Sequence, residues 1–276
     1  MDHVDTWHHG LVARWWAEFN VDGPEIDYFR GLIAAHGVPA LDAGCGTGRL
    51  LIPLLRDGID VDGVDVSDHM LAHCRERAER EGLAPRLLAQ PLHALELPRR
   101  YRTIFVCGSF GIGGEPTIDA RAIVRLRGAL QAGGVLAIDL PDATDRARWQ
   151  AWAERALPRM PNPWPDTGEQ QVAADGTVLE MRSRISNVDP VGRVLTMQIR
   201  VGIRRNGALV DEEEYTLRHS VYSEGQLIAL LVAAGCDDVH AVDGYQAAGA
   251  IGSGNAEGVV RVVLASAESS AAFDRR

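Results

Sequence analysis

The segment at residues 41–50, Leu-Asp-Ala-Gly-Cys-Gly-Thr-Gly-Arg-Leu, constrains the fold of this chain more than any other. It places glycines at alternate positions, Gly44, Gly46 and Gly48, between an apolar run and leucines at helical spacing. Glycine lets a backbone turn sharply and approach a ligand closely, because it has no side chain. A strand, a glycine turn and a helix in this order are typical of a nucleotide-binding α/β fold.

Predicted strands and helices alternate along residues 38–141. Strands are predicted where short apolar runs meet turn residues, and helices where apolar residues recur every three or four positions. Strands joined by helices form a parallel sheet whose two faces are covered. The predicted strands lie at 38–41, 59–66, 86–88, 101–107 and 135–140.

The pattern changes after Pro141 and then returns to the α/β type. Apolar residues alternate strictly with polar ones over 195–204, and Asp175-Gly176 and Asn206-Gly207 are strong hairpin signals. Four antiparallel strands are therefore predicted between about 169 and 222. A capping box at Ser223 and Gln226 then begins a helix. Other predicted elements are a helix at 120–131 closed by Gly133-Gly134, strands at 239–242 and 258–265, and a loop at 244–254.

The pattern Asp-x-Gly-x-Gly-x-Gly at residues 42–48 resembles motif I of the class I S-adenosylmethionine-dependent methyltransferases of the small-molecule type. The resemblance implies a doubly wound, seven-stranded Rossmann-like sheet with an inserted antiparallel β subdomain. The predicted regions are an N-terminal helical cap at 1–37, a cofactor-binding core at 38–141 and 223–265, the insert over the substrate pocket at 142–222, and a flexible tail at 266–276.

The resemblance also implies S-adenosylmethionine as cofactor and S-adenosylhomocysteine as product. Asp42 would reach the methionine end of the cofactor. Asp65 lies 21 residues after Gly44, the spacing of an acid that binds ribose hydroxyls, and it is favoured over Asp60 and Asp62, which come earlier in the strand. Gln90 stands where the family has an acid for the adenine amino group. The predicted cofactor-binding residues are Asp42, Gly44, Cys45, Gly46, Gly48, Asp65, Val66, Met70, Gln90, Pro91 and Gly108.

Met70 has two equally supported interpretations: it packs on the adenine ring of the cofactor, or it packs in the hydrophobic core. Both roles predict the same sequence pattern. The N-terminal helices likewise have two interpretations. They are either a helical cap or a lid over a ligand, and His8, His9 and Tyr28 are candidate site residues only as part of a lid.

Residues for the methyl acceptor are predicted around Gly108-Ser109-Phe110-Gly111, which corresponds to motif IV of the family at the mouth of the site. The predicted substrate residues are Trp15, Trp16, Tyr28, Ser109, Phe110 and Tyr215. His219 has the strand parity of Tyr215 and is the candidate catalytic base, since a histidine accepts a proton near neutral pH. The alternative for His219 is a core histidine.

Other functions have less support in the sequence. A dinucleotide-binding oxidoreductase requires glycine where this chain has Arg49, and a nucleophile elbow requires glycine where it has Cys107. Asp139 and Asp142 lack a third metal ligand, and none of the four cysteines forms a C-x-x-C pair, so no metal is predicted. A cofactor-binding protein without transferase activity stays open.

The charge and apolar pattern indicate the class of acceptor. A net charge of -10 disfavours nucleic acid, which leaves an RNA methyltransferase as a weaker alternative. No apolar run approaches the ~18 residues of a membrane span, and the start lacks signal-peptide features. The prediction is a cytoplasmic enzyme without a membrane partner. It would move a methyl group to a nitrogen or oxygen atom of a small molecule by in-line displacement.

Overall fold

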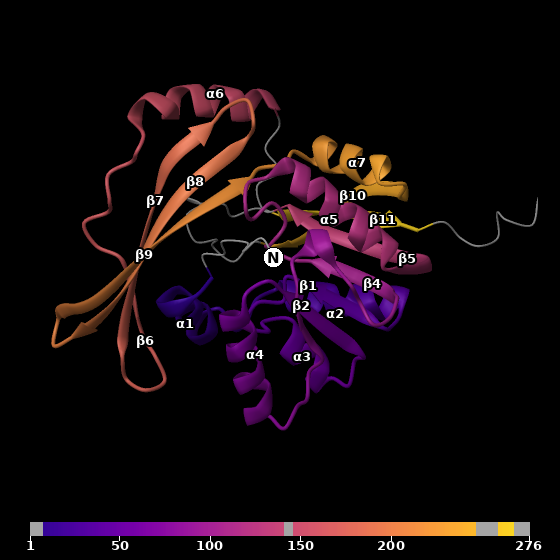
Figure 1. Cartoon of the computed structure of the whole chain (residues 1–276), viewed down its shortest axis with the longest axis horizontal. Coiled ribbons are helices and arrows are strands. Elements are labelled where there is room, and N and C mark those ends of the chain that lie inside the picture. Colours follow the sequence, from indigo (N-terminus) through magenta and orange to yellow (C-terminus); the bar gives the residue numbers. More distant parts are fainter. Residues whose placement is uncertain (1–7, 141–145, 247–258, 268–276) are drawn as a thin grey trace, which may run out of the picture.

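The computed structural model describes residues 8–140, 146–246 and 259–267 of the 276-residue chain. Its larger sheet has seven strands in the order β10-β11-β5-β4-β1-β2-β3 (Figure 1). The parallel strands are β1 (Ala40–Ala43), β2 (Val61–Asp65), β3 (Leu87–Ala89), β4 (Tyr101–Val106) and β5 (Leu130–Leu140). β11 (Val259–Ser266) runs antiparallel to β5, and β10 (Asp237–Gln246) runs antiparallel to β11. The predicted doubly wound sheet is confirmed.

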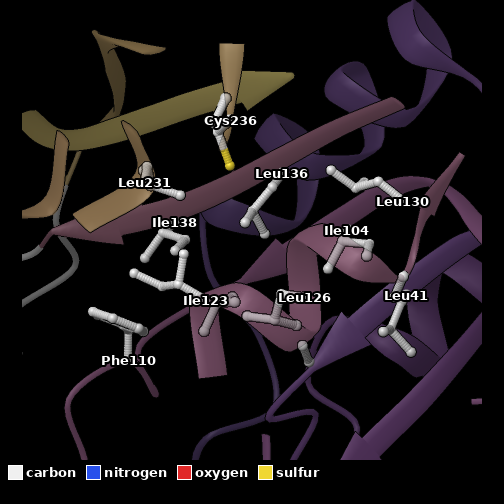
Figure 2. Packing of buried hydrophobic residues seen from close by; sticks show 14 of the residues in the cluster. Leu41, Ile104, Phe110, Ile123, Leu126, Leu130, Leu136, Ile138, Leu231 and Cys236 are labelled. Atoms are coloured by element: carbon white, nitrogen blue, oxygen red, sulfur yellow. The ribbon is translucent and has the colours of Figure 1, made fainter. Parts of the chain in front are cut away.

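Helices cover both faces of this sheet, because successive strand residues point to opposite sides. In β4, Ile104 packs with residues of α5 (Pro116–Gly128) and α7 (Glu224–Ala233), among them Ile123 and Leu126 (Figure 2). The next residue, Phe105, points to the other face and stacks on Phe29, with 4.9 Å between ring centroids. That face is covered by α2 (Glu25–His36), α3 (Leu51–Arg56) and α4 (Asp68–Arg80).

The order of the strands reverses beside β1. β1 pairs with β2 on one edge and with β4 on the other, so the chain leaves β1 in one direction and returns to its opposite side. Ligands of doubly wound folds bind at the carboxyl ends of the strands at such a reversal. The glycine turn directly follows β1 and therefore lies at this position.

A second sheet of four antiparallel strands forms the predicted insert. It consists of β6 (Glu169–Val172), β7 (Val178–Asp189), β8 (Val194–Arg205) and β9 (Ala208–Ser220). Asn206 and Gly207 have φ of 50° and 78°, the left-handed pair of a tight hairpin turn. α6 (Arg146–Ala156) covers one end of this sheet through Trp149 (Figure 1).

α1 (Gly10–Phe19) lies between the insert and the core, beside α4 (Figure 1). Its buried Val12 and Trp15 pack on the inner face of the insert with Ile199 and Leu217. The region expected to be helical at the N-terminus thus contains α1 and α2 within its described part.

The structure corrects three predicted boundaries. β5 begins at Leu130, which pairs with Tyr101, so the helix ends earlier than predicted and Gly133-Gly134 lies within the strand. β10 extends to Gln246, into the first residues of the loop predicted at 244–254; the rest of that loop is outside the described residues. The tail predicted from residue 266 is wrong for its first two residues, because Ser266 ends β11 and Ala267 N donates to Gly134 O at 3.1 Å.

Candidate active site

The glycine turn is packed too tightly for any other residue type at two of its positions. Gly44 and Gly48 have φ of 87° and 84°, a region that L-residues with a side chain rarely adopt. A β-carbon on Gly44 would lie 2.2 Å from Ser109 Oγ, and one on Gly48 would lie 2.6 Å from Cys74 Sγ. Gly48 therefore lets α3 pack on α4, while Gly44 lets the loop after β4 lie on the turn.

Asp65 fixes the turn from the end of β2. Its Oδ2 accepts a 2.9 Å hydrogen bond from Gly46 N, and its Oδ1 accepts a 2.8 Å bond from Ser67 N. Burial raises the pKa of Asp65, and these two bonds oppose that shift. The acid favoured by spacing thus lies directly beside the glycine turn, whereas Asp62 points to a different part of the fold, where Tyr101 OH donates to it at 2.8 Å.

Asp42, just before the glycine turn, has a buried carboxylate oxygen that receives no hydrogen bond. Its side chain is 3% exposed, and Oδ2 has no hydrogen-bond partner. Burial, reinforced by the nearby Asp65, raises the pKa of Asp42 to about 8. A buried oxygen without a partner is costly, so it marks a position that a ligand donor would satisfy.

The loop after β4 lies against the turn and exposes one position. Gly108, with φ of 67°, has open space where a β-carbon would stand. Its N–H donates to Asp139 Oδ1 at 2.8 Å, and Ser109 Oγ donates to Ala43 O at 3.2 Å. These bonds join the ends of β1, β4 and β5 around the open position at Gly108.

A polar cluster lies beneath this loop, and few sequence signals indicated it. Tyr245 OH donates to Asp139 Oδ2 at 2.5 Å and lies 3.5 Å from Cys107 Sγ. Arg49 forms an ion pair with Glu25 and lies 3.8 Å from the same sulfur. The one sequence feature that pointed to Asp139 was its place near the end of a predicted strand beside the site. Glu25 and Tyr245 come from elements whose docking the sequence does not specify.

His219 is brought to the candidate site by the last residues of β9. Its Nε2 lies 3.2 Å from Phe110 O, and it forms an isolated bridge with Ile112. Ser220 N donates to Gly111 O at 2.8 Å, which fixes the strand to the loop after β4. The candidate base thus contacts the segment that resembles motif IV.

Other predicted cofactor residues lie around the turn in different environments. The Met70 methyl group lies 3.2 Å from the position of a β-carbon on Gly46, so Met70 packs on the turn. The Cys45 side chain is buried in the core cluster beneath α3. The Gln90 amide exchanges hydrogen bonds of 3.1 and 2.8 Å with the Glu96 backbone. Val66 and Pro91 are half-buried beside the ends of β2 and β3.

The structure does not support three of the predicted substrate residues. Trp15 is 1% exposed between α1 and the insert, and Phe110 is buried in the core cluster shown in Figure 2. Tyr215 accepts a 3.3 Å bond from Val12 N and donates to Glu213, so it holds the start of α1. Tyr215 lies on the inner face of the insert, and α1 covers that part of the face.

The remaining predicted substrate residues Trp16, Tyr28 and Ser109 are half-buried. Tyr28 lies beside Tyr245, with 5.8 Å between ring centroids, at the edge of the polar cluster. The N-terminal segment contacts the core as well, since Ser67 Oγ donates to His8 O and the His9 ring lies edge-on to His69 of α4, with 6.1 Å between ring centroids.

The chain is similar to known methyltransferases in sequence and in fold. The family model of the methyltransferase domain matches residues 40–134. A phosphatidylethanolamine N-methyltransferase of Cereibacter sphaeroides is 31% identical over 133 residues, which are 47% of this chain and 63% of that protein. The chain spans between 41% and 63% of the length of the curated relatives that it matches.

Two solved structures resemble the fold over most of the chain. The CcbJ methyltransferase from Streptomyces caelestis has a TM-score of 0.66 at 20% identity, covering 98% of this chain and 100% of that one. The sugar N-methyltransferase KedS8 from Streptoalloteichus has a TM-score of 0.64 at 18% identity, covering 89% of this chain and 87% of that one. At these identities the likeness establishes a shared fold.

Proposed function

We propose that the protein, whose residues 40–134 match the family model of a methyltransferase domain, transfers the methyl group of S-adenosylmethionine to a nitrogen or oxygen atom of a small molecule. The observation that carries the proposal is Asp42 Oδ2, which is buried without a partner beside the glycine turn. The glycine turn leaves no room for a β-carbon, and Asp42 has a buried oxygen that receives no hydrogen bond. Both features fit a ligand that carries an ammonium group.

The chain's own groups suit the parts of this cofactor. Asp42 would hold the methionine end, while Gly44 and Gly46 let the backbone approach it. Each Asp65 oxygen accepts one backbone N–H and keeps a further lone pair for a ribose hydroxyl. Gln90 Oε1 likewise keeps a lone pair for the adenine amino group.

The reaction requires little beyond alignment. When bound, the cofactor supplies a methyl group already activated by its sulfonium. The chain has to hold the acceptor atom in line with the carbon–sulfur bond and exclude water, and such positioning lowers a barrier by ~7–11 kcal/mol. The open position at Gly108 is the place we assign to the acceptor atom, since the next residue, Ser109, packs on Gly44, and Phe110 O lies 3.2 Å from His219 Nε2.

His219 is the group we assign to the acceptor proton. If Nε2–H donates to Phe110 O, the basic nitrogen of the neutral ring is Nδ1. Methyl transfer to the acceptor atom would release one proton from the acceptor, and His219 would take it. The sulfur of the donor would become neutral and the His219 imidazolium would carry the positive charge, so that charge balances.

A small acceptor is favoured by the surroundings of this position. The insert and α1 both stand over the carboxyl ends of the core strands, which limits the room for a macromolecule (Figure 1). The net charge of -10 opposes binding to nucleic acid. No helix in the described ranges is long and apolar enough to cross a membrane.

The test is S-adenosylhomocysteine formation with a panel of amino sugars, sugar hydroxyls and phenols. We expect product with at least one member, and none with Asp42→Ala at the same protein concentration. Cofactor binding without turnover across the panel would favour a binding protein. A melting temperature raised by NAD(P)H and not by S-adenosylmethionine would favour an oxidoreductase.

A further inference from the structure

The carboxyl ends of four adjacent strands form a row of acids around one cysteine. In the sheet order β5-β4-β1-β2, the row contains Asp139, Cys107, Asp42 and Asp65. The register places Asp42 beside Phe105, and Ile138 beside Val106, so Asp139 and Cys107 lie at about the same height. Both Asp139 and Asp42 act on the buried Cys107 thiol and help to raise its pKa.

The acids in this row are removed from water. Asp139 is 4% exposed and Asp42 is 3% exposed. Asp139 accepts hydrogen bonds from Gly108 N and Tyr245 OH, which stabilise its carboxylate, while burial raises its pKa. Burying several carboxylates close together is unfavourable unless a cation or a proton compensates.

The cations near the row compensate its charge only in part. Arg49 lies 3.8 Å from Cys107 Sγ and opposes the rise in the pKa of Asp139, but it also forms an ion pair with Glu25, which is itself 5% exposed, so that pair adds no net charge. Arg77 donates to Thr47 O at 2.7 Å on the other side of the glycine turn. In the described part of the chain, Asp42 Oδ2 has no partner, so the compensation of the row is incomplete.

We infer that Asp42 and Asp139 make the site selective for the net charge of its ligand, so that the chain distinguishes the cationic methyl donor from its neutral product. This inference rests on the proposed function. S-adenosylmethionine carries a sulfonium, an ammonium and a carboxylate, with a net charge of +1, whereas S-adenosylhomocysteine is a neutral zwitterion. A buried negative row stabilises the first more than the second, which favours release of the product after methyl transfer.

The test compares the dissociation constants of the two ligands in Asp139→Asn, measured by calorimetry at pH 7. Asparagine keeps an acceptor for Gly108 N and removes the charge. We expect the ratio of the product's constant to the donor's constant to fall by about tenfold, the scale of one charge acting through a partly buried site. The control is Asp60→Asn, which removes a carboxylate just before the opposite end of β2 and should leave the ratio within twofold of wild type.

A measurement on the wild-type protein covers the case in which Asp139→Asn does not fold. Binding a cation ionises the row, so the donor should release more protons than the product when titrated in two buffers of different ionisation enthalpy. An unchanged ratio in Asp139→Asn, or equal proton release for both ligands, overturns the inference and leaves the proposed function intact. Failure of both ligands to bind overturns the proposed function itself.

Discussion

The Ser109 side chain occupies the space beside Gly44 that a β-carbon would need, with Oγ 2.2 Å from that position. This contact joins the turn after β1 to the loop after β4, the two segments that resemble motifs I and IV. The positions proposed for the cofactor and the acceptor are therefore joined through one pair of residues.

Gly44→Ala should disrupt this pair. The new methyl group would displace Ser109 and impose a left-handed φ on an L-residue, so we expect affinity for S-adenosylmethionine to fall more than tenfold. Gly58→Ala is the matched control, because Gly58 has a similar φ of 76° and open space around it. That variant should lose only ~1–2 kcal/mol of stability and retain affinity. Equal losses of affinity in both variants would contradict the account.

The pH dependence of cofactor binding should report on Asp42. Its folded pKa is raised from 3.8 to about 8, so ligand-free stability is greatest when Asp42 is protonated and declines as the pH rises through that interval. An ammonium partner favours the carboxylate, so affinity should rise with pH up to about 8, by as much as tenfold per unit, and then level off. Asp42→Asn should flatten both curves; a curve in this variant that follows the wild type would contradict the assignment.

His219→Gln should separate proton transfer from binding. We expect kcat to fall by roughly 10²-fold while affinity for S-adenosylhomocysteine stays within twofold, because general-base catalysis contributes to the chemical step. His240→Gln is the control, since His240 is half-exposed on β10 and its ring contacts Asp238. An unchanged kcat in His219→Gln would show that alignment alone suffices.

Tyr215→Phe should loosen α1 without disturbing the core. The substitution removes the acceptor of Val12 N, and a bond of this kind contributes about 1 kcal/mol. Hydrogen exchange should accelerate by roughly fivefold at residues 11–16 and remain unchanged in β1 and β4. Thr216→Val, a change at the exposed neighbouring position on β9, should leave both regions unchanged. Equal acceleration throughout the chain would instead indicate global destabilisation.

The features of the fold that could be predicted are those indicated by residues close together in the sequence. Apolar runs followed by turn residues located the strands, and the resemblance implied a doubly wound sheet of seven strands. Asn206-Gly207 was recognised because its left-handed turn demands those residue types. Asp65 was favoured over Asp62 because ligands bind at the carboxyl ends of strands.

The contacts that could not be predicted depend on how segments that are far apart in the sequence pack together. Strand parity placed Tyr215 on the same strand face as His219, yet only the docking of α1 shows that a helix covers Tyr215. The cluster of Glu25, Arg49 and Tyr245 joins α2, the glycine turn and β10, which are far apart in the sequence. No spacing rule connects such residues, so these contacts become visible only in three dimensions.

Hydrogen-exchange protection on binding S-adenosylhomocysteine tests the central claim most directly. The account predicts slower exchange at residues 44–49, at 65–67 and at 107–111, with no change at the amino ends of β1, β2 and β4. Absence of protection, or protection confined to the separate cavity of about 720 Å³ lined by Trp149, Arg193 and Gln226, would contradict it.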